Sequence, residues 1–357
     1  MNLFKWIFYN FSPKYQYIDF SKINSVLIIR NDHIGDVCLS IPFIHLLKQT
    51  HKHIKTDVLT GEYTYEILSG NPYIDNIIIQ NKTDKINDII KKAGTYDIVF
   101  NLCSSKFNAV LTRKIPAKIK IGYAYKIYNI FSFNRFVYIH RKNPPIHETE
   151  FCFEFLKSLG FTGNTKKAVE SSEIFIDEKS KAVSDRLFIK MNFDQSKKII
   201  GIHSGDSKSA FNWKLDKYIE LGESLSKKYN IVFIFGPQET SALNNFTDSQ
   251  KIKFRFIEGN LKLKELAYFI SKIDCLVSGS TGPMHIAGLM RTPTVSLFSN
   301  KPSHSYLKWH PLNNNFKIIE PEINYSKKNK YNIMDSITVE KTIKEILCFE
   351  MISLGTS

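Results

Sequence analysis

The feature that most constrains the fold is a polar turn between an apolar run and a helix, in residues 273–290. Residues 273–277 are Ile-Asp-Cys-Leu-Val, which is typical of a buried strand, and residues 278–282 are Ser-Gly-Ser-Thr-Gly. The helix-like segment that follows ends near Met290. Backbone N–H groups and the positive end of the helix dipole converge at such a helix start, which suits a phosphate group. The turn therefore predicts an α/β arrangement with an anion-binding loop.

The same pattern occurs twice earlier in the chain. The run 25–30 is followed by Asn-Asp-His-Ile-Gly-Asp at 31–36, and the run 198–203 is followed by Ser-Gly-Asp-Ser-Lys-Ser at 204–209. The second loop is not a Walker A motif, which requires G-x-x-x-x-G-K-[ST]. It fits both an ordinary Ser/Gly turn and an anion-binding loop. Three such turns in one chain point to a nucleotide-linked substrate.

Strands and helices alternate along both halves of the sequence at the spacing of βαβ units, which implies parallel sheets. The first half is expected to hold strands at 25–30, 55–60, 76–80 and 97–102, with helices at 36–50, 64–69, 86–93 and 147–159. The second half is expected to hold strands at 198–203, 231–235, 254–257, 275–278 and 294–298, with helices at 215–228, 263–271, around His285 and at 339–349. The pattern is blurred from 113 to 145.

These two series predict two doubly wound, Rossmann-like α/β domains with a cleft between them, and ligands at the carboxyl ends of the strands. The expected boundaries are an aromatic N-terminal segment (1–20), a first domain (21–170), a linker (171–195), a second domain (196–335), and a C-terminal helix and tail (336–357). The linker is polar, with one strand-like piece at 173–176.

Two features bear on where the protein works. The N-terminal segment is too short for a transmembrane helix, which needs roughly 20 apolar residues. It either lies at a membrane interface through its aromatic and lysine side chains or packs on its own domain as a first helix. The five cysteines are scattered, without a CxxC pair or a Cys/His cluster, which argues against disulfides and structural zinc. A cytoplasmic location is the simplest expectation.

The formal net charge of +15 is unevenly spread, with a basic stretch between Asn101 and His147. That stretch contains no Asp or Glu, and aromatic residues interleave its nine basic residues: Lys106, Arg113, Lys114, Lys118, Lys120, Lys126, Arg135, Arg141 and Lys142. Such a surface would attract an anionic partner, and nucleic acid, an acidic glycolipid and a membrane surface all fit. A generally lysine-rich proteome is the alternative explanation.

Asp36 is the candidate for chemistry in the first domain. It follows Gly35 at the start of the predicted helix, near the carboxyl end of the first strand. It either caps the helix or acts as a base that accepts a proton from an attacking hydroxyl, a role that contributes about 10²–10⁴-fold to rate. Its neighbours Asp32 and His33 either form the loop or line the substrate site.

Two residues in the second domain have open roles. His285 lies one turn after Thr281, so that both share the first turn of a helix in which Pro283 is tolerated. It is either structural or a ligand of the anion. Trp213 is either a core residue or a wall of the cleft.

Three common motifs are missing from the chain. There is no Asp-x-Asp pair, no G-x-G-x-x-G and no G-x-S-x-G. Their absence argues against a dicarboxylate site for a metal-bound nucleotide diphosphate, a standard dinucleotide oxidoreductase and an α/β-hydrolase, respectively.

In its ordered motifs the chain resembles glycosyltransferase family 9, the ADP-heptosyltransferase family of lipopolysaccharide core assembly. The resemblance runs from about residue 24 to 319 and is carried by 26–30 with 34–37 and 39–42, by 202–205, by Trp213, and by 280–287 with 293–298. It implies a GT-B fold of two facing Rossmann-like domains, with the acceptor in the first and the nucleotide sugar in the second. It also implies an inverting enzyme that needs no metal and no cofactor.

The resemblance further implies roles for single residues. Asp36 is the expected base, and Thr281, Gly282 and His285 are expected to hold the leaving phosphates. The full set expected to bind the donor is His203, Ser204, Gly205, Lys208, Trp213, Ser280, Thr281, Gly282, Pro283, Met284 and His285. The residues expected to bind the acceptor are Asp32, His33, Gly35, Arg113 and Lys120.

The chain departs from the family pattern at two positions. Phe211 stands where many members carry Lys or Arg, and Ser280 stands where many carry Asp. The donor that the resemblance implies is ADP-heptose, and the acceptor is an acidic glycolipid of the lipopolysaccharide core, reached by peripheral contact with the inner membrane. No nucleic-acid partner is then expected. Two alternatives stay open: a nucleotide-sugar epimerase or hydrolase on the same fold, and a basic protein that binds anionic surfaces or nucleic acid.

Overall fold

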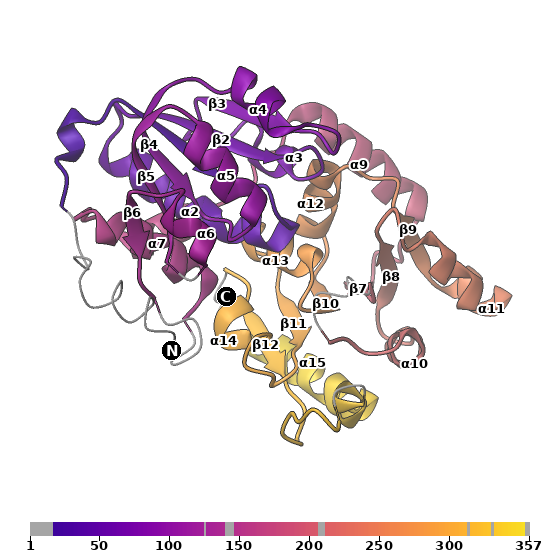
Figure 1. Cartoon of the computed structure of the whole chain (residues 1–357). Helices are drawn as coiled ribbons and strands as arrows, with labels where there is room; N and C mark the ends of the chain where they lie inside the picture. Colours follow the sequence, from indigo (N-terminus) through magenta and orange to yellow (C-terminus); the bar gives the residue numbers. More distant parts are fainter. Residues whose placement is uncertain are drawn as a thin grey trace. The chain divides into compact units, whose positions relative to one another are not determined.

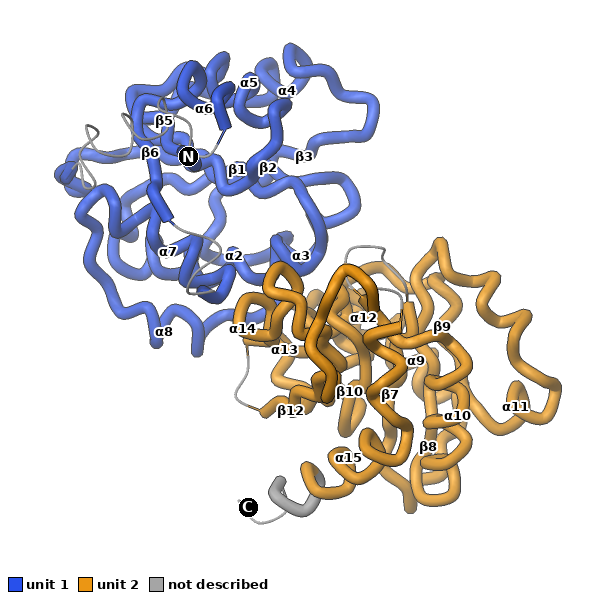
Figure 2. The backbone as a smooth tube through the Cα atoms, turned by 60° about the horizontal axis from the view of Figure 1, so that its bottom comes forward, with its two compact units in different colours: residues 1–175 blue, residues 176–357 orange. Residues whose placement is uncertain are grey.

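The computed structural model of the chain describes residues 17–124, 126–139, 146–205, 211–312, 315–329 and 332–353. The chain divides into two compact units, Met1–Phe175 and Ile176–Ser357. Figure 1 shows the elements in chain order, and Figure 2 colours the two units. Each unit has a six-stranded parallel sheet of its own with helices between successive strands, so the predicted α/β class is confirmed.

Unit 1 is built on a sheet of strand order β3-β2-β1-β4-β5-β6, in which every neighbouring pair is parallel. The strands are β1 Ser25–Ile29, β2 Lys55–Gly61, β3 Asn76–Gln80, β4 Tyr96–Asn101, β5 Ala117–Tyr123 and β6 Arg135–Val137. The central strand β1 is buried from its second residue onward. Because helices cover both faces of such a sheet, this strand is an uninterrupted apolar run in the sequence.

The helices of unit 1 are η1 Phe20–Lys22, α2 Ile34–Thr50, α3 Tyr65–Leu68, α4 Ile86–Lys92, α5 Lys106–Lys114, α6 Ile127–Ile130, α7 Glu148–Ser158 and α8 Thr165–Glu170. Unit 1 contains one long helix, α2, against which α3, α7 and α8 pack. Every residue of α2 from Val37 to Leu47 is buried, because α7 and α8 pack against it. This packing fixes the first turn of α2 beside the carboxyl end of β1.

His45 in the middle of α2 is buried and hydrogen-bonded through both ring nitrogens. Its Nε2 lies 3.2 Å from the Asn71 amide nitrogen, and its Nδ1 lies 3.3 Å from the Ser171 hydroxyl. The Asn71 amide is oriented by its oxygen, which accepts the Tyr73 N–H. Nε2 is therefore the acceptor of a neutral imidazole, and Nδ1 is the donor. Burial lowers the pKa of His45 to about 4, although the hydrogen bonds to Asn71 and Ser171 oppose the shift.

We expect His45 to make the fold sensitive to acid. Its ordinary pKa of 6.5 applies to the unfolded chain. Between pH 6.5 and about pH 4, the ring is therefore protonated in the unfolded chain but neutral in the folded chain. Its contribution to stability is complete above pH 6.5 and is lost as the pH falls toward 4, by about 2 kcal/mol between pH 7.5 and pH 5. Urea unfolding at these two pH values should show a smaller acid loss for His45→Gln than for the wild type. An equal loss in both proteins would contradict this role.

Unit 2 repeats the topology of unit 1. Its sheet has the order β12-β11-β10-β7-β8-β9, again with parallel neighbours. The strands are β7 Ile199–His203, β8 Asn230–Phe235, β9 Arg255–Glu258, β10 Cys275–Gly279, β11 Thr294–Leu297 and β12 Phe316–Ile319. Counted from β7, this is the same order as in unit 1, the arrangement of a doubly wound Rossmann sheet. The predicted Rossmann-like architecture is thus confirmed for both units.

The helices of unit 2 include a C-terminal helix that packs back on the unit. They are α9 Glu178–Met191, α10 Leu215–Leu225, η2 Thr240–Asn245, α11 Asp248–Lys253, α12 Leu263–Ser271, α13 Gly282–Leu289, α14 Tyr306–Trp309, η3 Ile333–Ser336 and α15 Val339–Ser353. Helix α15 contacts α10 and β12. The aromatic rings of Phe233, Phe246 and Phe254 pack against one another in the core of this unit.

The predicted linker, residues 171–195, is largely helical. Helix α9 lies within it and packs against α12, so it belongs to unit 2, and the boundary between the units falls directly after Phe175. Only Ser180, Ser184 and Met191 of α9 are buried. A helix with so narrow a buried face has a polar composition typical of a linker. The strand-like piece at 173–176 pairs with no strand.

The blurred stretch 113–145 supplies the last two strands of the first sheet. β5 and β6 lie there, with α6 between them. Lys118 and Lys120 interrupt the apolar character of β5, whose first four residues are not fully buried. A strand this close to the edge of the sheet lacks the continuous apolar run that reveals β1.

Among the described residues, none of the helices combines the length and apolar character needed to cross a membrane. The predicted interfacial segment falls mostly within residues 1–16, outside the described residues.

Candidate functional site

Each sheet reverses its strand order at one point, between β1 and β4 in unit 1 and between β7 and β10 in unit 2. Ligands of doubly wound sheets bind at such a switch point, outside the carboxyl ends of the strands. The connection from β1 into α2 carries Asp32 and His33, and Asp36 lies in the first turn of α2. His203 ends β7, and Thr281 follows β10. Most of the predicted site residues therefore gather at the switch point of their own unit.

Arg30, directly after β1, organises the site in unit 1. Its side chain is only 2% exposed, and its Nη1 donates to the Leu102 carbonyl at 2.8 Å, which joins the two strands of the switch point. Its Nη2 donates to the carboxylates of Asp36 at 3.2 Å and Glu148 at 3.1 Å. Its Nε donates to the Asp36 carbonyl at 3.0 Å and lies 3.5 Å from the Asp32 carboxylate. One guanidinium thus holds carboxylates from the β1 loop, α2 and α7.

The surrounding carboxylates explain how Arg30 remains charged in the interior. Burial works against the charged guanidinium, but Asp32 and Asp36 outweigh it and hold the pKa of Arg30 well above its ordinary value. Glu148 is as buried as Arg30, whereas 18% of the Asp36 side chain and 29% of the Asp32 side chain are exposed. Asp36 and Asp32 are therefore the carboxylates of this group that a substrate can reach.

Asp36 is the third residue of α2, and the N-cap position belongs to His33. A carboxylate in the first turn is favoured by the helix dipole. The Asp36 side chain faces Arg30, so its role is not limited to capping the helix. Gly35 is half-buried beside it, and His33 is exposed.

A neutral polar cluster lies close to these charges. Asn108 donates to Asn31 at 2.6 Å, and Asn31 donates in return at 3.0 Å. Asn31 also donates to the side-chain oxygen of Gln80. The three side chains come from the loop after β1, from α5 and from the end of β3. Amide groups of this kind are suited to hydrogen-bond the hydroxyls of a sugar.

Two residues expected to bind the acceptor lie elsewhere in unit 1. Arg113 is exposed in the last turn of α5, and the Lys120 ammonium donates to the Arg113 carbonyl at 2.6 Å. Lys120 pairs with Val99 in the middle of the sheet rather than at its carboxyl edge. Neither residue therefore lies at the switch point that carries Asp36. Their charges stabilise the carbonyl end of α5 instead.

The turn after β10 presents buried polar groups without partners. Thr281 is the N-cap residue of α13, yet its side chain makes no capping hydrogen bond. Its hydroxyl, His285 Nδ1 and the Ser299 hydroxyl are buried and find no partner among the described residues. Thr281 and Ser299 each lie two residues beyond the last paired residues of their strands, Gly279 and Leu297. Because an unpaired buried polar group costs about 1–3 kcal/mol, this edge is typical of a site that a polar ligand completes.

The first turn of α13 is suited to an anion. The backbone N–H groups of Gly282 and Met284 belong to the first turn, where a helix provides no partner, and Pro283 has no N–H to satisfy. Burial, with a smaller contribution from His310, lowers the pKa of His285 to about 3. His285 is therefore neutral at physiological pH and offers a hydrogen bond rather than a charge.

His203, Ser204 and Gly205 lie at the end of β7 and are buried. The His203 ring donates from Nδ1 to the Ile234 carbonyl at 2.8 Å, and burial lowers its pKa although Glu239 opposes the shift. Glu239 lies so close to this loop that a side chain at Gly205 would collide with its carboxylate. Its other oxygen accepts a backbone N–H of the turn after β8 at 2.7 Å.

Asn212 ties the loop after β7 to the end of β10. Its amide nitrogen donates to the Gly205 carbonyl at 2.9 Å, and its oxygen accepts the Tyr218 hydroxyl at 2.6 Å and the Trp213 N–H at 2.9 Å. A Cβ at Gly279 would lie 2.5 Å from that oxygen. Residue 279 must therefore be glycine for this loop to lie against the start of the turn.

Trp213 is a core residue. Its side chain is buried, and its indole N–H lies 3.0 Å from the Met334 carbonyl and 3.1 Å from the Ile337 carbonyl. This corrects the expectation that Trp213 binds the donor, because both its ring and its N–H are already engaged. Lys208 falls within 206–210, outside the described residues, and Ser280 is half-buried at the turn.

Sequence reasoning missed Arg30, Glu148 and Glu239 as site residues. A signal existed for Arg30, because a charge directly after an apolar run at a strand end is unusual. A similar signal existed for Glu239, which follows the Gly-Pro turn at the end of β8. Glu148 gave no local signal, since it is 118 residues from Arg30 and only the fold brings the two together.

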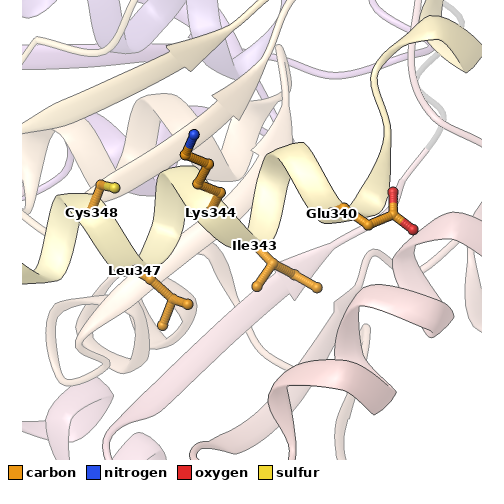
Figure 3. Close-up of a pocket in the computed structure, with 5 residues that line it drawn as sticks. All are labelled: Glu340, Ile343, Lys344, Leu347 and Cys348. Atoms are coloured by element: carbon orange, nitrogen blue, oxygen red, sulfur yellow. The ribbon is translucent and has the colours of Figure 1, made fainter.

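A hollow of about 470 Å³ on the C-terminal helix is not the site (Figure 3). It is lined by α15 alone, through Glu340, Ile343, Lys344, Leu347 and Cys348. It therefore lacks the converging polar groups from several strand ends that the switch points provide. Among the described residues there is also no group of three or more His, Cys, Asp or Glu side chains that could hold a metal ion.

Comparisons with known proteins identify similar chains. The model of glycosyltransferase family 9 (heptosyltransferase) matches residues 91–337. A putative glycosyltransferase of Haemophilus influenzae is 26% identical over 337 residues, which cover 92% of this chain and 97% of that protein. Lipopolysaccharide heptosyltransferase 3 of Escherichia coli K12 is 27% identical over 300 residues, covering 79% and 83%. The solved structure of E. coli ADP-heptose lipopolysaccharide heptosyltransferase II has a similar fold, with a TM-score of 0.72 at 17% identity, covering 92% of this chain and 99% of that one.

Proposed function

Because the chain belongs to glycosyltransferase family 9, we propose that it transfers heptose from ADP-heptose to the core of a lipopolysaccharide or lipooligosaccharide. The chain is a glycosyltransferase by its family. The choice of donor and acceptor is supported by the relatives, which include a lipopolysaccharide heptosyltransferase and an ADP-heptose enzyme of similar fold.

The observation that carries the proposal is the set of unpaired polar groups at the start of α13. The hydroxyls of Thr281 and Ser299 and the Nδ1 atom of His285 are buried without partners among the described residues. A nucleotide sugar brings a diphosphate, whose oxygens accept hydrogen bonds from hydroxyls, from a neutral imidazole N–H and from the open backbone N–H groups of a helix start. These donors act most strongly as the bond between the sugar and the diphosphate breaks, because the diphosphate then gains negative charge.

In unit 1 we assign the proton transfer to Asp36. The acceptor hydroxyl oxygen attacks the anomeric carbon and gives its proton to the Asp36 carboxylate. The bond between the anomeric carbon and the diphosphate oxygen breaks, and ADP leaves with the electron pair. A single displacement of this kind inverts the anomeric configuration, and we propose that it proceeds without a metal ion. Arg30 holds the Asp36 carboxylate in place through Nη2 at 3.2 Å.

We propose that the basic stretch 101–147 attracts the acidic acceptor at the cytoplasmic face of the inner membrane. Several of its cations, such as Lys106, Lys114 and Lys126, are exposed among the described residues. Arg141 and Lys142 lie outside them. Exposed cations of this kind favour contact with anionic headgroups and core phosphates.

Incubation of the purified protein with ADP-heptose and a heptose-deficient core acceptor tests the proposal. We expect ADP release and an acceptor heavier by one heptose in mass spectrometry, and no free heptose when the acceptor is omitted. Acceptor-independent release of heptose would identify a hydrolase instead. Because Ser280 and Phe211 depart from the family pattern, UDP- and GDP-sugars belong in the same assay, and turnover with one of them but not with ADP-heptose would replace the proposed donor.

A further inference from the structure

Four side chains from three loops meet in unit 2, and we call them the aromatic–lysine cluster: Phe211, Lys301, His304 and Tyr325. The Lys301 ammonium lies 5.1 Å from the centre of the Phe211 ring and 5.6 Å from that of Tyr325. The two rings are 5.8 Å apart, and Phe211 also meets the His304 ring edge-on at 5.5 Å. Two aromatic faces thus hold one lysine in place.

The order of the strands places this cluster over the turn that starts α13. Phe211 belongs to the loop after β7, whereas Lys301 and His304 belong to the loop after β11. In the sheet, β10 lies between β7 and β11. A contact between the two loops therefore has to cross the carboxyl end of β10. Asn212, the neighbour of Phe211, lies against Gly279 at that end, which agrees with this crossing.

Lys301 carries a charge that no carboxylate among the described residues balances. Lys272 shows the contrast: it also lies over two rings, 5.6 Å from Phe188 and 4.8 Å from Tyr268, but it is paired with Asp185. A cation–π contact is weak at a partly exposed site, and it does not satisfy the three N–H donors of an ammonium. Lys301 is therefore held in position for an anionic partner.

Unpaired hydrogen-bonding groups accompany Lys301 on its own loop. Ser299 is only 2% exposed, and its buried hydroxyl has no partner among the described residues. The Nδ1 atom of His304 is likewise buried and has no partner among them. Burial lowers the pKa of His304, and Lys301 and Lys308 add to the shift, so His304 is a neutral donor or acceptor. A cation beside unpaired hydroxyl and imidazole groups matches the oxygens of a phosphate.

We propose that Lys301 binds the diphosphate of a nucleoside diphosphate donor, together with Thr281, Ser299 and the first turn of α13. Phe211 and Tyr325 position the lysine. The inference rests on the proposed function only in taking a nucleoside diphosphate as the ligand class, and it does not depend on the base or the sugar.

Titration of ADP into the purified full chain by calorimetry tests the inference. Lys301→Ala should raise the Kd for ADP about 10- to 100-fold, because it removes one charged hydrogen bond to phosphate. Lys301→Arg keeps the charge and should stay within a few-fold of wild type. Lys272→Ala is the matched control: it removes a lysine of the same charge from two rings, but one paired with Asp185, and should leave the Kd unchanged. Thermal unfolding of each variant checks that it is folded.

The outcomes separate this inference from the proposed function. Equal ADP affinity in wild type and Lys301→Ala overturns the inference and leaves the proposed function in place. If the wild type binds UDP or GDP but not ADP, and Lys301→Ala weakens that binding, the inference holds and the proposed donor falls. A wild-type chain that binds no nucleoside diphosphate overturns both.

Discussion

Replacing Asp36 by Asn is expected to lower kcat by about 10²–10⁴-fold while the fold is retained. Asn has nearly the shape of Asp, and its side-chain oxygen can still accept the hydrogen bond that Arg30 Nη2 gives to Asp36 at 3.2 Å. An amide is not a base at physiological pH, so the variant cannot take the proton of the acceptor hydroxyl. Initial rates with ADP-heptose and a core acceptor, together with an unfolding curve, measure both parts of the expectation.

Asp32 distinguishes a base from a charge that merely supports Arg30. Its carboxylate lies 3.5 Å from Arg30 Nε and is partly exposed, so Asp32→Asn removes the same charge from the surroundings of Arg30. If Asp36 is the base, Asp36→Asn abolishes the acidic limb of the pH–rate profile and Asp32→Asn preserves it. Full activity of Asp36→Asn would contradict the assignment. So would equal losses in the two variants with unchanged pH profiles.

Replacing Arg30 by Met is expected to lower the free energy of unfolding by about 3–5 kcal/mol. The substitution removes a cation 3.1 Å from Glu148, a carboxylate whose side chain is only 2% exposed. It also removes the hydrogen bond that Arg30 Nη1 donates to the Leu102 carbonyl oxygen at 2.8 Å. A buried charge that loses its partner keeps the cost of desolvation without the compensating attraction. Urea unfolding of the variant and the wild type at pH 7 measures the difference.

A second substitution and a surface control sharpen this test. Arg30→Met with Glu148→Gln should be more stable than Arg30→Met alone, because the glutamine brings no unpaired charge into the interior. Lys118→Met breaks the ion pair between Lys118 and Asp97, which measures 2.8 Å but involves a lysine side chain that is 81% exposed. That control should cost less than about 1 kcal/mol. Equal losses for Arg30→Met and Lys118→Met would show that the buried network adds no particular stability.

The strand–turn–helix segments of both units were predictable because their signals are local. A strand covered on both faces, such as β1, is apolar along its length, and the polar turn follows within a few residues. These patterns place Asp36 and Thr281 at the carboxyl ends of strands without knowledge of the strand order. Helix α9, within the predicted linker, was not predictable in this way, because it buries only a narrow face and is otherwise as polar as a loop.

The partners of the site residues could not be predicted in this way. Glu148 meets Arg30 across 118 residues of sequence, and Trp213 is held by a carbonyl 121 residues away. Phe211 meets Lys301 because the loops after β7 and β11 meet over the carboxyl end of β10, the strand that lies between β7 and β11 in the sheet. No periodicity or spacing encodes such contacts.

The sequence by itself determined a family 9 glycosyltransferase with two Rossmann-like domains, a carboxylate at the start of the first long helix and a Thr-Gly helix start in the second domain. It could do so because apolar runs, turns and motifs are short-range patterns. Only the tertiary structure decided that Arg30 binds both Asp36 and Glu148 and that Trp213 belongs to the core. It also decided that the Thr281 and Ser299 hydroxyls and His285 Nδ1 have no partner within the described part of the chain. Burial and charge pairing arise where distant segments meet, so they exist only once the strand order of each sheet is set.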